Sequence, residues 1–332
     1  MKVWRAEDQR PADVAVIIPT ILRPSLERAV RSVFGQDLSA TIQILIGIDK
    51  PAGDGDLLRR LKAAAPKNVR LTILDLGYST SLRHGGLVNA WAGGALRTML
   101  SYAANSRYVA YLDDDNWWDE KHLSSLLETV QGAEWAYSKH WFVDAQSLEP
   151  LCVDEWESLG PGQGVFKDSF GGFVDPNCLL LDRFVCEPVL RLWSVAPDKN
   201  AGRMTDRNIF YNLKNHFSHS GSGLPTAFYV LQPADPRHPE RLEFIKGAEP
   251  GPAEFLAREA TRRRNEVASW PERRGVKAAA SGRRATGVYR WRGAQRHHSV
   301  AKYPLRGRGR QSAGPRSAMD HSFRAPLPLE QR

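Results

Sequence analysis

The sequence has few cysteines and no long apolar run, and these absences exclude several classes of protein. Only three of its 332 residues are cysteines, and Cys152, Cys178 and Cys186 are widely spaced without a Cys-x-x-Cys pair. This usage is typical of reduced cysteines in a cytosolic protein rather than of zinc ligands or disulfides. No apolar run approaches the roughly 18 residues that a membrane-spanning helix needs, and the N-terminus has no apolar signal region. We therefore expect a cytoplasmic protein without a transmembrane segment.

Several catalytic and nucleotide-binding motifs are also missing. The predicted first strand, residues 14–18, is followed by Pro19 and Thr20 instead of a Gly-x-Gly-x-x-Gly turn, which argues against a dinucleotide-binding fold. The sequence has no Gly-x-x-x-x-Gly-Lys-Ser/Thr phosphate loop, no Gly-x-Ser-x-Gly elbow and no His-Glu-x-x-His zinc helix. Several common enzyme classes are thereby excluded.

Positive charge is concentrated at the C-terminal end of the chain. The formal net charge is +9, but residues 251–332 hold 19 of the 46 basic and 6 of the 37 acidic residues. This segment therefore carries +13, and residues 1–250 carry −4. Arg, Gly, Ala and Ser dominate it, so we predict a largely disordered basic tail, with a helix over 253–270 at its start. Such a tail is suited to binding the phosphates of nucleic acid or an anionic membrane surface.

Apolar strands alternate with helices over the first part of the chain. Strands are predicted over 14–18, 42–48, 69–74 and 108–112, and helices beginning near Leu26, Leu57 and Asn89 separate them. Continuous apolar strands of this kind indicate an α/β fold with a mostly parallel sheet and helices on both faces. Polar residues end these strands and should line one carboxyl-terminal edge of the sheet: Thr20, Asp49, Asp75 and Asp113 to Asp115.

After Asp119 the pattern predicts a small antiparallel portion. A helix over 123–130 is followed by a hairpin of strands 135–143 and 148–153, a Gly-rich loop over 155–172 and a strand over 173–181, then helices over 182–193 and from Asp206, and a strand over 226–231. The resulting division is an N-terminal extension (1–12), a first half (13–116), a second half (117–250) and the basic tail (251–332).

Three consecutive carboxylates, Asp113, Asp114 and Asp115, directly follow the buried strand over 108–112. Like charges repel, and their desolvation is costly unless a cation or several hydrogen-bond donors are present. An isolated acidic triplet is usually a solvated loop, here with Asp119 capping the next helix. The position of this triplet after a buried strand favours a metal or ligand site instead.

Four features in this order resemble the inverting family 2 glycosyltransferases of the GT-A fold. The strand over 14–20 is followed by Arg23 and a helix ending at Gln36, the second strand ends at Asp49, a helix precedes the Asp triplet, and the hairpin turns after Val143. The resemblance covers about residues 13–231. The sequence departs from the family in having Asp-Lys-Pro at 49–51, and it has no Gln-x-x-Arg-Trp motif, so a processive synthase is not expected.

The resemblance implies a nucleoside-diphosphate-sugar donor and a Mn²⁺ or Mg²⁺ ion. Residues matching the donor site are Pro19, Thr20, Arg23, Asp49, Asn89, Asp113 and Asp114. Asp115 is the expected metal ligand with Asp113 beside it, and His219 is the expected third ligand, with His216 as the alternative. A hard cation prefers carboxylate oxygens, bridges to the diphosphate and offsets the charge on the leaving group.

The resemblance also places a carboxylate base near the acceptor hydroxyl, and Asp206 matches that position. A plain helix N-cap is its alternative role, and Asp175 is the rival base or an acceptor contact, together with Asn177. Trp117 and Trp118 are expected to stack on acceptor sugar rings, although aromatics beside a strand are equally often buried. The loop over 155–172 is a candidate lid over the donor. The acceptor is expected to be a sugar, a lipid-linked sugar or a small molecule.

Two other functions compete with glycosyl transfer. A sugar-nucleotidyltransferase shares the sheet architecture, but it needs a Gly-rich first loop for the triphosphate, which Pro19 and Thr20 do not provide. An anion- or nucleic-acid-binding protein would work through the basic tail, but few aromatics are interleaved there and no known binding module is present.

Overall fold

The computed structural model describes residues 10–50, 55–90, 93–196 and 205–248. All of them belong to the compact unit Met1–Pro271. The predicted basic tail over 251–332, its helix over 253–270 and most of the N-terminal extension over 1–12 lie outside the described residues.

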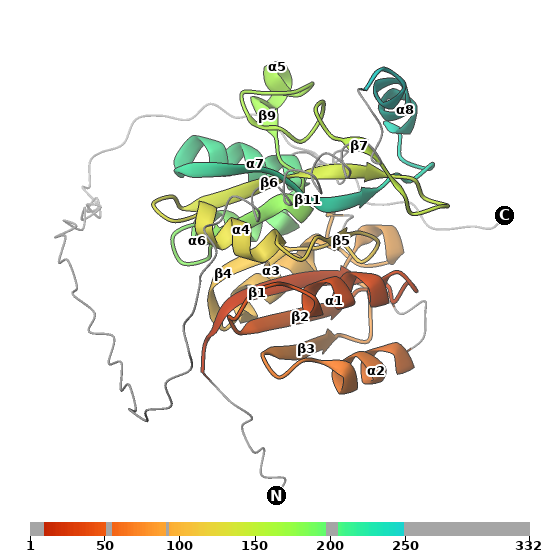
Figure 1. The fold of residues 1–332 in the computed structure, drawn as a ribbon. Helices are drawn as coiled ribbons and strands as arrows, with labels where there is room; N and C mark the ends of the chain where they lie inside the picture. The colour runs from red at the N-terminus through yellow and green to blue at the C-terminus, as the bar shows by residue number, and fades with distance from the viewer. Residues whose placement is uncertain (1–9, 51–54, 91–92, 197–204, 249–332) are drawn as a thin grey trace, which may run out of the picture. The chain divides into compact units, whose positions relative to one another are not determined.

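A mixed nine-stranded sheet runs through both halves of the described chain (Figure 1). Its first four strands are parallel neighbours in the order β3 (Val69–Asp75), β2 (Ile42–Ile48), β1 (Ala12–Thr20) and β4 (Ser106–Tyr111). All seven residues of β2 are buried, as expected for a parallel strand covered on both faces. The prediction of a mostly parallel α/β sheet is therefore confirmed.

The sheet becomes mixed beyond β4. There β10 (Leu179–Asp182) pairs antiparallel with β4 and with β6 (Trp135–Val143). The next strand, β11 (His219–Val230), runs parallel to β6 and antiparallel to β5 (Trp117–Trp118). The predicted hairpin is present, because β7 (Pro150–Val153) pairs antiparallel with β6. A separate two-stranded sheet joins β8 (Gly160–Pro161) to β9 (Gly172–Phe173).

Two groups of helices flank the sheet (Figure 1). One group packs together around the 3₁₀ segment Arg191–Ser194: α3 (Gly94–Ala103), α6 (Glu187–Leu190) and α7 (Thr205–His216). The other contains α1 (Leu26–Phe34), α2 (Asp56–Ala64) and α4 (His122–Thr129). In α1 the buried residues Leu26, Ala29, Val30 and Val33 recur at helical spacing, which is why the sequence predicts this helix correctly.

Two predicted helix boundaries are wrong for identifiable reasons. The helix expected from Asn89 begins only at Gly94, after Gly93 adopts a left-handed φ of 67°. A Cβ on Gly93 would lie 2.6 Å from the Cβ of Pro19, so a glycine is needed where this loop meets the end of β1. The helix expected over 182–193 is broken at its start, because the Asp182 carboxylate accepts the backbone N–H groups of Phe184 and Val185 in a turn.

Two short helices were not predicted. One is α5 (Lys167–Phe170), within the loop that precedes β9. The other is α8 (His238–Gly247), whose only buried residue is Arg241. Without an apolar stripe, α8 gives no periodic signal in the sequence. None of the helices in the described part of the chain combines the length and the apolar character that a membrane crossing requires.

Candidate functional site

The carboxyl ends of the parallel strands gather the predicted polar residues at one edge of the sheet. Register pairs Thr20 with Ile48, and Ile48 with Asp75, and the Asp49 N–H donates to the Thr20 carbonyl at 2.9 Å. The same register places Asp114 beside Thr20, whose hydroxyl donates to its carboxylate at 2.6 Å. The prediction of a shared polar edge is confirmed.

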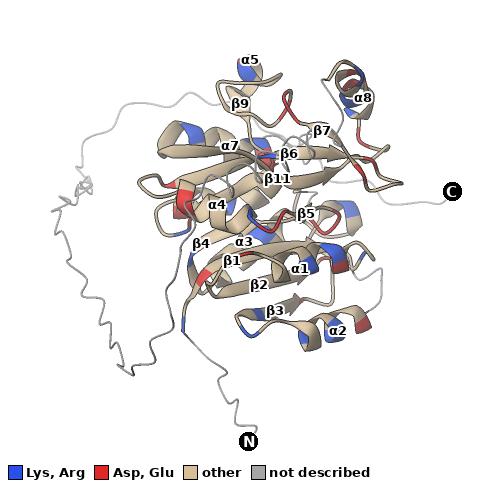
Figure 2. Cartoon of the chain, viewed as in Figure 1, with Lys and Arg blue, Asp and Glu red and all other residues tan. Residues whose placement is uncertain are grey.

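Acidic and basic residues are spread over many helices and loops of the described chain (Figure 2), and the three consecutive aspartates among them have different environments. Asp113 forms an ion pair with the buried Arg97 and accepts a hydrogen bond from the Asn177 amide at 3.1 Å. Asp114 is buried, with one oxygen bound to Thr20 and the other 3.0 Å from Arg23. Only Asp115 projects into a cleft, where Arg23 contacts its Oδ2 at 2.8 Å. Asp114 therefore holds the loop in place, and Asp115 is the member available to a ligand.

Burial works against the charge of this triplet. It raises the pKa of Asp114, and together with the neighbouring Asp113 it raises the pKa of Asp115 to about 6. The Arg23 guanidinium opposes both shifts by stabilising the carboxylates. Arg23 therefore favours the ionised forms of Asp114 and Asp115.

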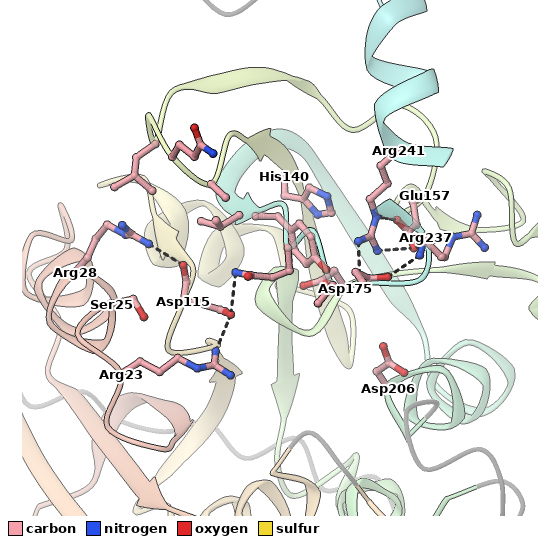
Figure 3. A pocket seen from close by; sticks show the side chains of 18 of the residues that line it. Arg23, Ser25, Arg28, Asp115, His140, Glu157, Asp175, Asp206, Arg237 and Arg241 are labelled. Atoms are coloured by element: carbon pink, nitrogen blue, oxygen red, sulfur yellow. Dashed lines mark hydrogen bonds and ion pairs between the residues drawn. The ribbon is translucent and has the colours of Figure 1, made fainter. Parts of the chain in front are cut away.

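A large cleft runs from the triplet into the second half of the described chain (Figure 3). Its volume is about 1900 Å³, whereas a pocket for one drug-sized ligand has about 300–1,000 Å³. Arg23, Arg28 and Asp115 lie at one end, and Asp175 and Asp206 lie toward the other. The cleft therefore has room for two ligands, with a basic end and an end lined by additional carboxylates.

Arg28 gives the first end of the cleft its suitability for phosphate. Its Nη2 donates to the backbone carbonyl of Asp115 at 2.8 Å, and its guanidinium lies 4.4 Å from the centre of the Trp117 ring. Burial lowers the pKa of Arg28, and its Nε is buried without a hydrogen-bond partner. Arginine forks bind phosphate oxygens well, and a buried N–H without a partner favours a ligand that accepts from it.

Asn177 joins the triplet to the second carboxylate group. Its backbone N–H and side-chain amide donate to Asp175 Oδ1 at 2.9 and 2.6 Å, and the same amide reaches Asp113. Burial, with Asp113 and Asp206 nearby, raises the pKa of Asp175 to about 7. Burial also raises the pKa of Asp206, while Arg207 and Arg97 oppose that rise. Asn177 is fully enclosed, so it positions two carboxylates rather than contacting a ligand.

Replacing Asp175 with Asn is expected to stabilise the protein at pH 8 and to change its stability little near pH 4. The folded-state pKa of about 7 lies above the ordinary 3.8, so the stabilising contribution of this carboxyl is present below pH 4 and lost as pH rises through 7. Asn keeps the oxygen that accepts from Asn177. We expect a gain of at least about 1.4 kcal/mol at pH 8, the equivalent of one pKa unit. Urea unfolding at both pH values measures it, and an equal effect at both would contradict the assignment.

The residues around Asp115 fit one mode of metal binding. Among the described residues, no three His, Cys, Asp or Glu side chains form a group that could hold a metal ion. Arg97 and Asn177 occupy both oxygens of Asp113, which leaves Asp115. Its side-chain partners Arg23 and Gln232 both contact Oδ2. The remaining oxygen suits a Mg²⁺-type ion whose other ligands are waters and the phosphates of a substrate.

The expected histidine ligand lies elsewhere. His219 begins β11, and the register aligns it with Trp135, then Leu181, then Val109, which lies three strands away and well before Asp113. Strand spacing and rise place it on the order of 20 Å from Asp113. Its ring packs 5.0 Å from Trp135. His216 ends α7, before that strand. The described structure therefore does not bring His219 together with the triplet.

The two tryptophans after the triplet do not line the cleft. Trp118 is buried, stacks on His122 at 4.2 Å and donates its indole N–H to the Asn177 carbonyl. Trp117 stacks on Phe228 and also carries the Arg28 guanidinium. The buried ring of Trp118 cannot stack on an acceptor sugar, contrary to expectation. The ring of Trp117 already packs against Phe228 and Arg28.

Three of the expected donor-site residues, Pro19, Asp49 and Asn89, do not line the cleft. Asp49 is buried and accepts from the Ser79 hydroxyl at 2.9 Å and from the Thr80 N–H. Asn89 lies ahead of α3 and is not among the residues that line the cleft. Pro19 packs against the loop at Gly93. These residues shape the edge of the sheet next to the cleft.

The loop over 155–172 belongs to the second end of the cleft. The Asp154 carboxylate accepts backbone N–H groups from Trp156, Glu157 and Ser158 and so fixes the start of the loop. Phe166, from the middle of the loop, is buried in the core, and Glu157 lines the cleft near Asp175 (Figure 3). The loop is therefore anchored beside the second carboxylate group rather than over the basic end.

Sequence reasoning missed several charged residues that build the site. Arg97 is a single cation within an otherwise small and apolar helix, which is a visible signal for a buried partner of a carboxylate. Arg241 and Glu157 are far apart in sequence and form a buried bidentate pair. His140 and Asp154 are likewise buried neighbours at 3.3 Å. Only the fold brings the last four together, so no local pattern could identify them.

The fold and the cleft together define an α/β protein that presents a ligand site at the carboxyl edge of a mostly parallel sheet. No family model and no curated protein matches the sequence. Among solved structures, S. aureus TarS matches with a TM-score of 0.50 and 11% identity over 69% of this chain. The chain spans 38% of that structure, so the likeness concerns the fold alone. The structure of TarS 1–349 in complex with UDP also matches, with a TM-score of 0.47 and 11% identity, over 67% of this chain and 61% of that one. The complex with UDP-GlcNAc matches with a TM-score of 0.42 and 12% identity, over 73% of this chain and 63% of that one.

Proposed function

We propose that this protein is an inverting glycosyltransferase of the GT-A type that resembles family 2. It would move a sugar from a nucleoside-diphosphate sugar to an acceptor hydroxyl. The observation that carries the proposal is the cleft, which has Asp115 among arginines at one end and two carboxylates with raised pKa values toward the other. Its size accommodates a donor and an acceptor together.

The donor would bind with its diphosphate at the basic end. Arg23 and Arg28 supply guanidinium groups there, and Arg28 has a buried N–H without a partner. Such groups stabilise the negative charge that develops on a leaving nucleoside diphosphate. A Mg²⁺ or Mn²⁺ ion held by Asp115 and the diphosphate would supply the same stabilisation as a Lewis acid. Arg23 then serves to keep Asp115 ionised and aimed at this end.

Asp206 is the proposed base. It lines the cleft at the beginning of α7, and among the described residues its Oδ1 accepts only the local N–H of Arg207. Its raised pKa makes it a stronger base than an exposed carboxylate. Asp175 is more enclosed and holds two hydrogen bonds from Asn177, which favours a supporting role. In transfer, Asp206 takes the proton of the acceptor hydroxyl. The acceptor oxygen bonds to the sugar as the bond between the sugar and the diphosphate breaks, and the nucleoside diphosphate leaves.

A thermal-shift screen of nucleoside diphosphates tests the donor site. UDP, GDP, ADP, CDP and dTDP are each added with and without Mn²⁺. We expect at least one to raise Tm, and the rise to be larger with Mn²⁺, because a ligand that binds only the folded state stabilises it. The matching nucleoside monophosphate is the control, since it lacks the second phosphate. If no diphosphate stabilises the protein under either condition, the proposed function is contradicted.

A further inference from the structure

Arg207 is a cleft-lining cation without an ion-pair partner among the described residues. The neighbouring arginines of the second end are paired, since Arg241 contacts Glu157 and Asp235, and Arg237 contacts Glu240 at 2.8 Å. Arg207, by contrast, opposes the rise in the pKa of the preceding residue, Asp206, without forming an ion pair with it. Its Nε is buried and lacks a hydrogen-bond partner. An enclosed N–H of this kind is costly unless a ligand or a water accepts from it.

Aromatic rings hold the Arg207 guanidinium in place. It lies 4.3 Å from the centre of Phe166, 5.3 Å from Phe170 and 5.8 Å from Phe173. Arg237 lies 4.6 Å from the centre of the same Phe166 ring. Ring faces attract a cation without satisfying its N–H groups. The Phe166 ring therefore carries two guanidinium groups, and the Nε–H of each is buried without a hydrogen-bond partner.

The position of Arg207 separates it from the donor end. It follows the proposed base on α7, whereas Arg23 and Arg28 come from the segment after β1. In Figure 3, Asp206 lies across the cleft from Arg23 and Asp115. A group bound by Arg207 would thus belong to the molecule whose hydroxyl faces Asp206.

We infer that the acceptor carries an anionic oxygen group, a phosphate or a carboxylate, close to the hydroxyl that receives the sugar, and that Arg207 binds this group. That the bound molecule is an acceptor rests on the proposed function. The anion site itself is defined by Arg207 and the aromatic rings that pack against it. A guanidinium fork matches the paired oxygens of either group. Arg237, on the same ring, is paired with Glu240 through Nη2, and only its Nε could reach such a group.

Three sugars with the same ring test the inference by direct binding: glucose, glucuronate and glucose 6-phosphate. They differ at C6, which is neutral, a carboxylate or a phosphate. Binding is measured by NMR titration of the whole chain, first alone and then with UDP and Mn²⁺ present. We expect at least one anionic sugar to bind about tenfold or more tightly than glucose, the worth of a charge-assisted hydrogen bond. Whichever anionic sugar binds more tightly identifies the class.

The variant Arg207→Gln should remove that preference, and Arg207→Lys should retain part of it. The matched control is Arg183→Gln, because Arg183 lies 4.4 Å over Phe184 but contacts the Ser106 carbonyl and does not line the cleft. Equal binding of all three sugars, absence of binding by both anionic sugars, or a preference that survives in Arg207→Gln would overturn the inference. Because the first titration contains no nucleotide, its result is independent of whether diphosphates bind the donor end.

Discussion

Replacing Asp206 with Asn is expected to reduce the rate of sugar transfer about 10²- to 10⁴-fold, the usual contribution of a positioned general base. Asn has nearly the same shape, and its Oδ1 still accepts the Arg207 N–H that the Asp206 carboxylate accepts at 2.8 Å. It cannot take a proton from the acceptor hydroxyl. Donor binding at the other end of the cleft should change little. A single-turnover assay, with donor affinity measured in parallel, separates the two effects.

Two comparisons make this experiment decisive. Asp168→Asn changes an exposed carboxylate in the first turn of α5 and should leave transfer unaltered. Asp175→Asn changes the rival base and should affect transfer less than the Asp206 variant. Transfer by Asp206→Asn within a few-fold of the unmodified protein would refute its assignment, and a severe loss in Asp175→Asn alone would transfer the role to Asp175.

Replacing Arg241 with Leu is expected to lower the free energy of unfolding by about 3–5 kcal/mol, as when one partner of a buried ion pair is removed. Arg241 Nε and Nη2 donate to the two oxygens of Glu157 at 2.7 and 3.1 Å, and a further ion pair reaches Asp235 at 3.0 Å. Arg241 and Glu157 are both about 5% exposed or less. Without Arg241, the Glu157 carboxylate stays buried with only the longer contact to Arg237. Urea unfolding measures the loss.

The same helix provides a matched control. Lys246 pairs with Glu243 in α8, and both side chains are more than 70% exposed, so Lys246→Leu should cost no more than about 1 kcal/mol. Adding Glu157→Gln to Arg241→Leu should restore part of the lost stability, because the unpaired charge is then removed. Equal losses in the Arg241 and Lys246 variants would show that the buried pair does not secure α8.

The sequence predicts the sheet well because its strands and helices have strong local patterns. The strand over 42–48 and the helix that begins at Leu26 agree with β2 and α1. Burial on both faces gives a continuous apolar run in the sequence, and burial of one helix face gives apolar residues at helical spacing. The helix expected over 182–193 fails because the Asp182 turn and Pro188 compete with it locally. The α8 helix is missed because its contacts, the buried Arg241 and the half-buried Phe244 and Ile245, do not form a periodic apolar stripe.

The candidate site divides in the same way. Thr20 and the Asp triplet follow strands directly, so their meeting at one edge could be foreseen from the parallel topology. His219 is misplaced because its neighbourhood depends on how far β11 extends before Thr226, which the sequence leaves open. The pairing of Arg97 with Asp113 and the aromatic support of Arg207 depend on tertiary packing. Such contacts cannot be obtained from spacing along the chain.

Calorimetric titration of nucleoside-diphosphate sugars tests the central claim most directly. The nucleotide of the sugar donor is the one whose diphosphate gives the largest thermal shift in the screen, and Mn²⁺ is present throughout. The proposed cleft predicts one binding site whose affinity falls about tenfold or more in Asp115→Asn, which loses its charge among the arginines, and changes little in Asp75→Asn, an exposed residue that holds a turn at the same edge. No binding by any nucleotide sugar, or equal affinity in the Asp115 and Asp75 variants, would contradict it.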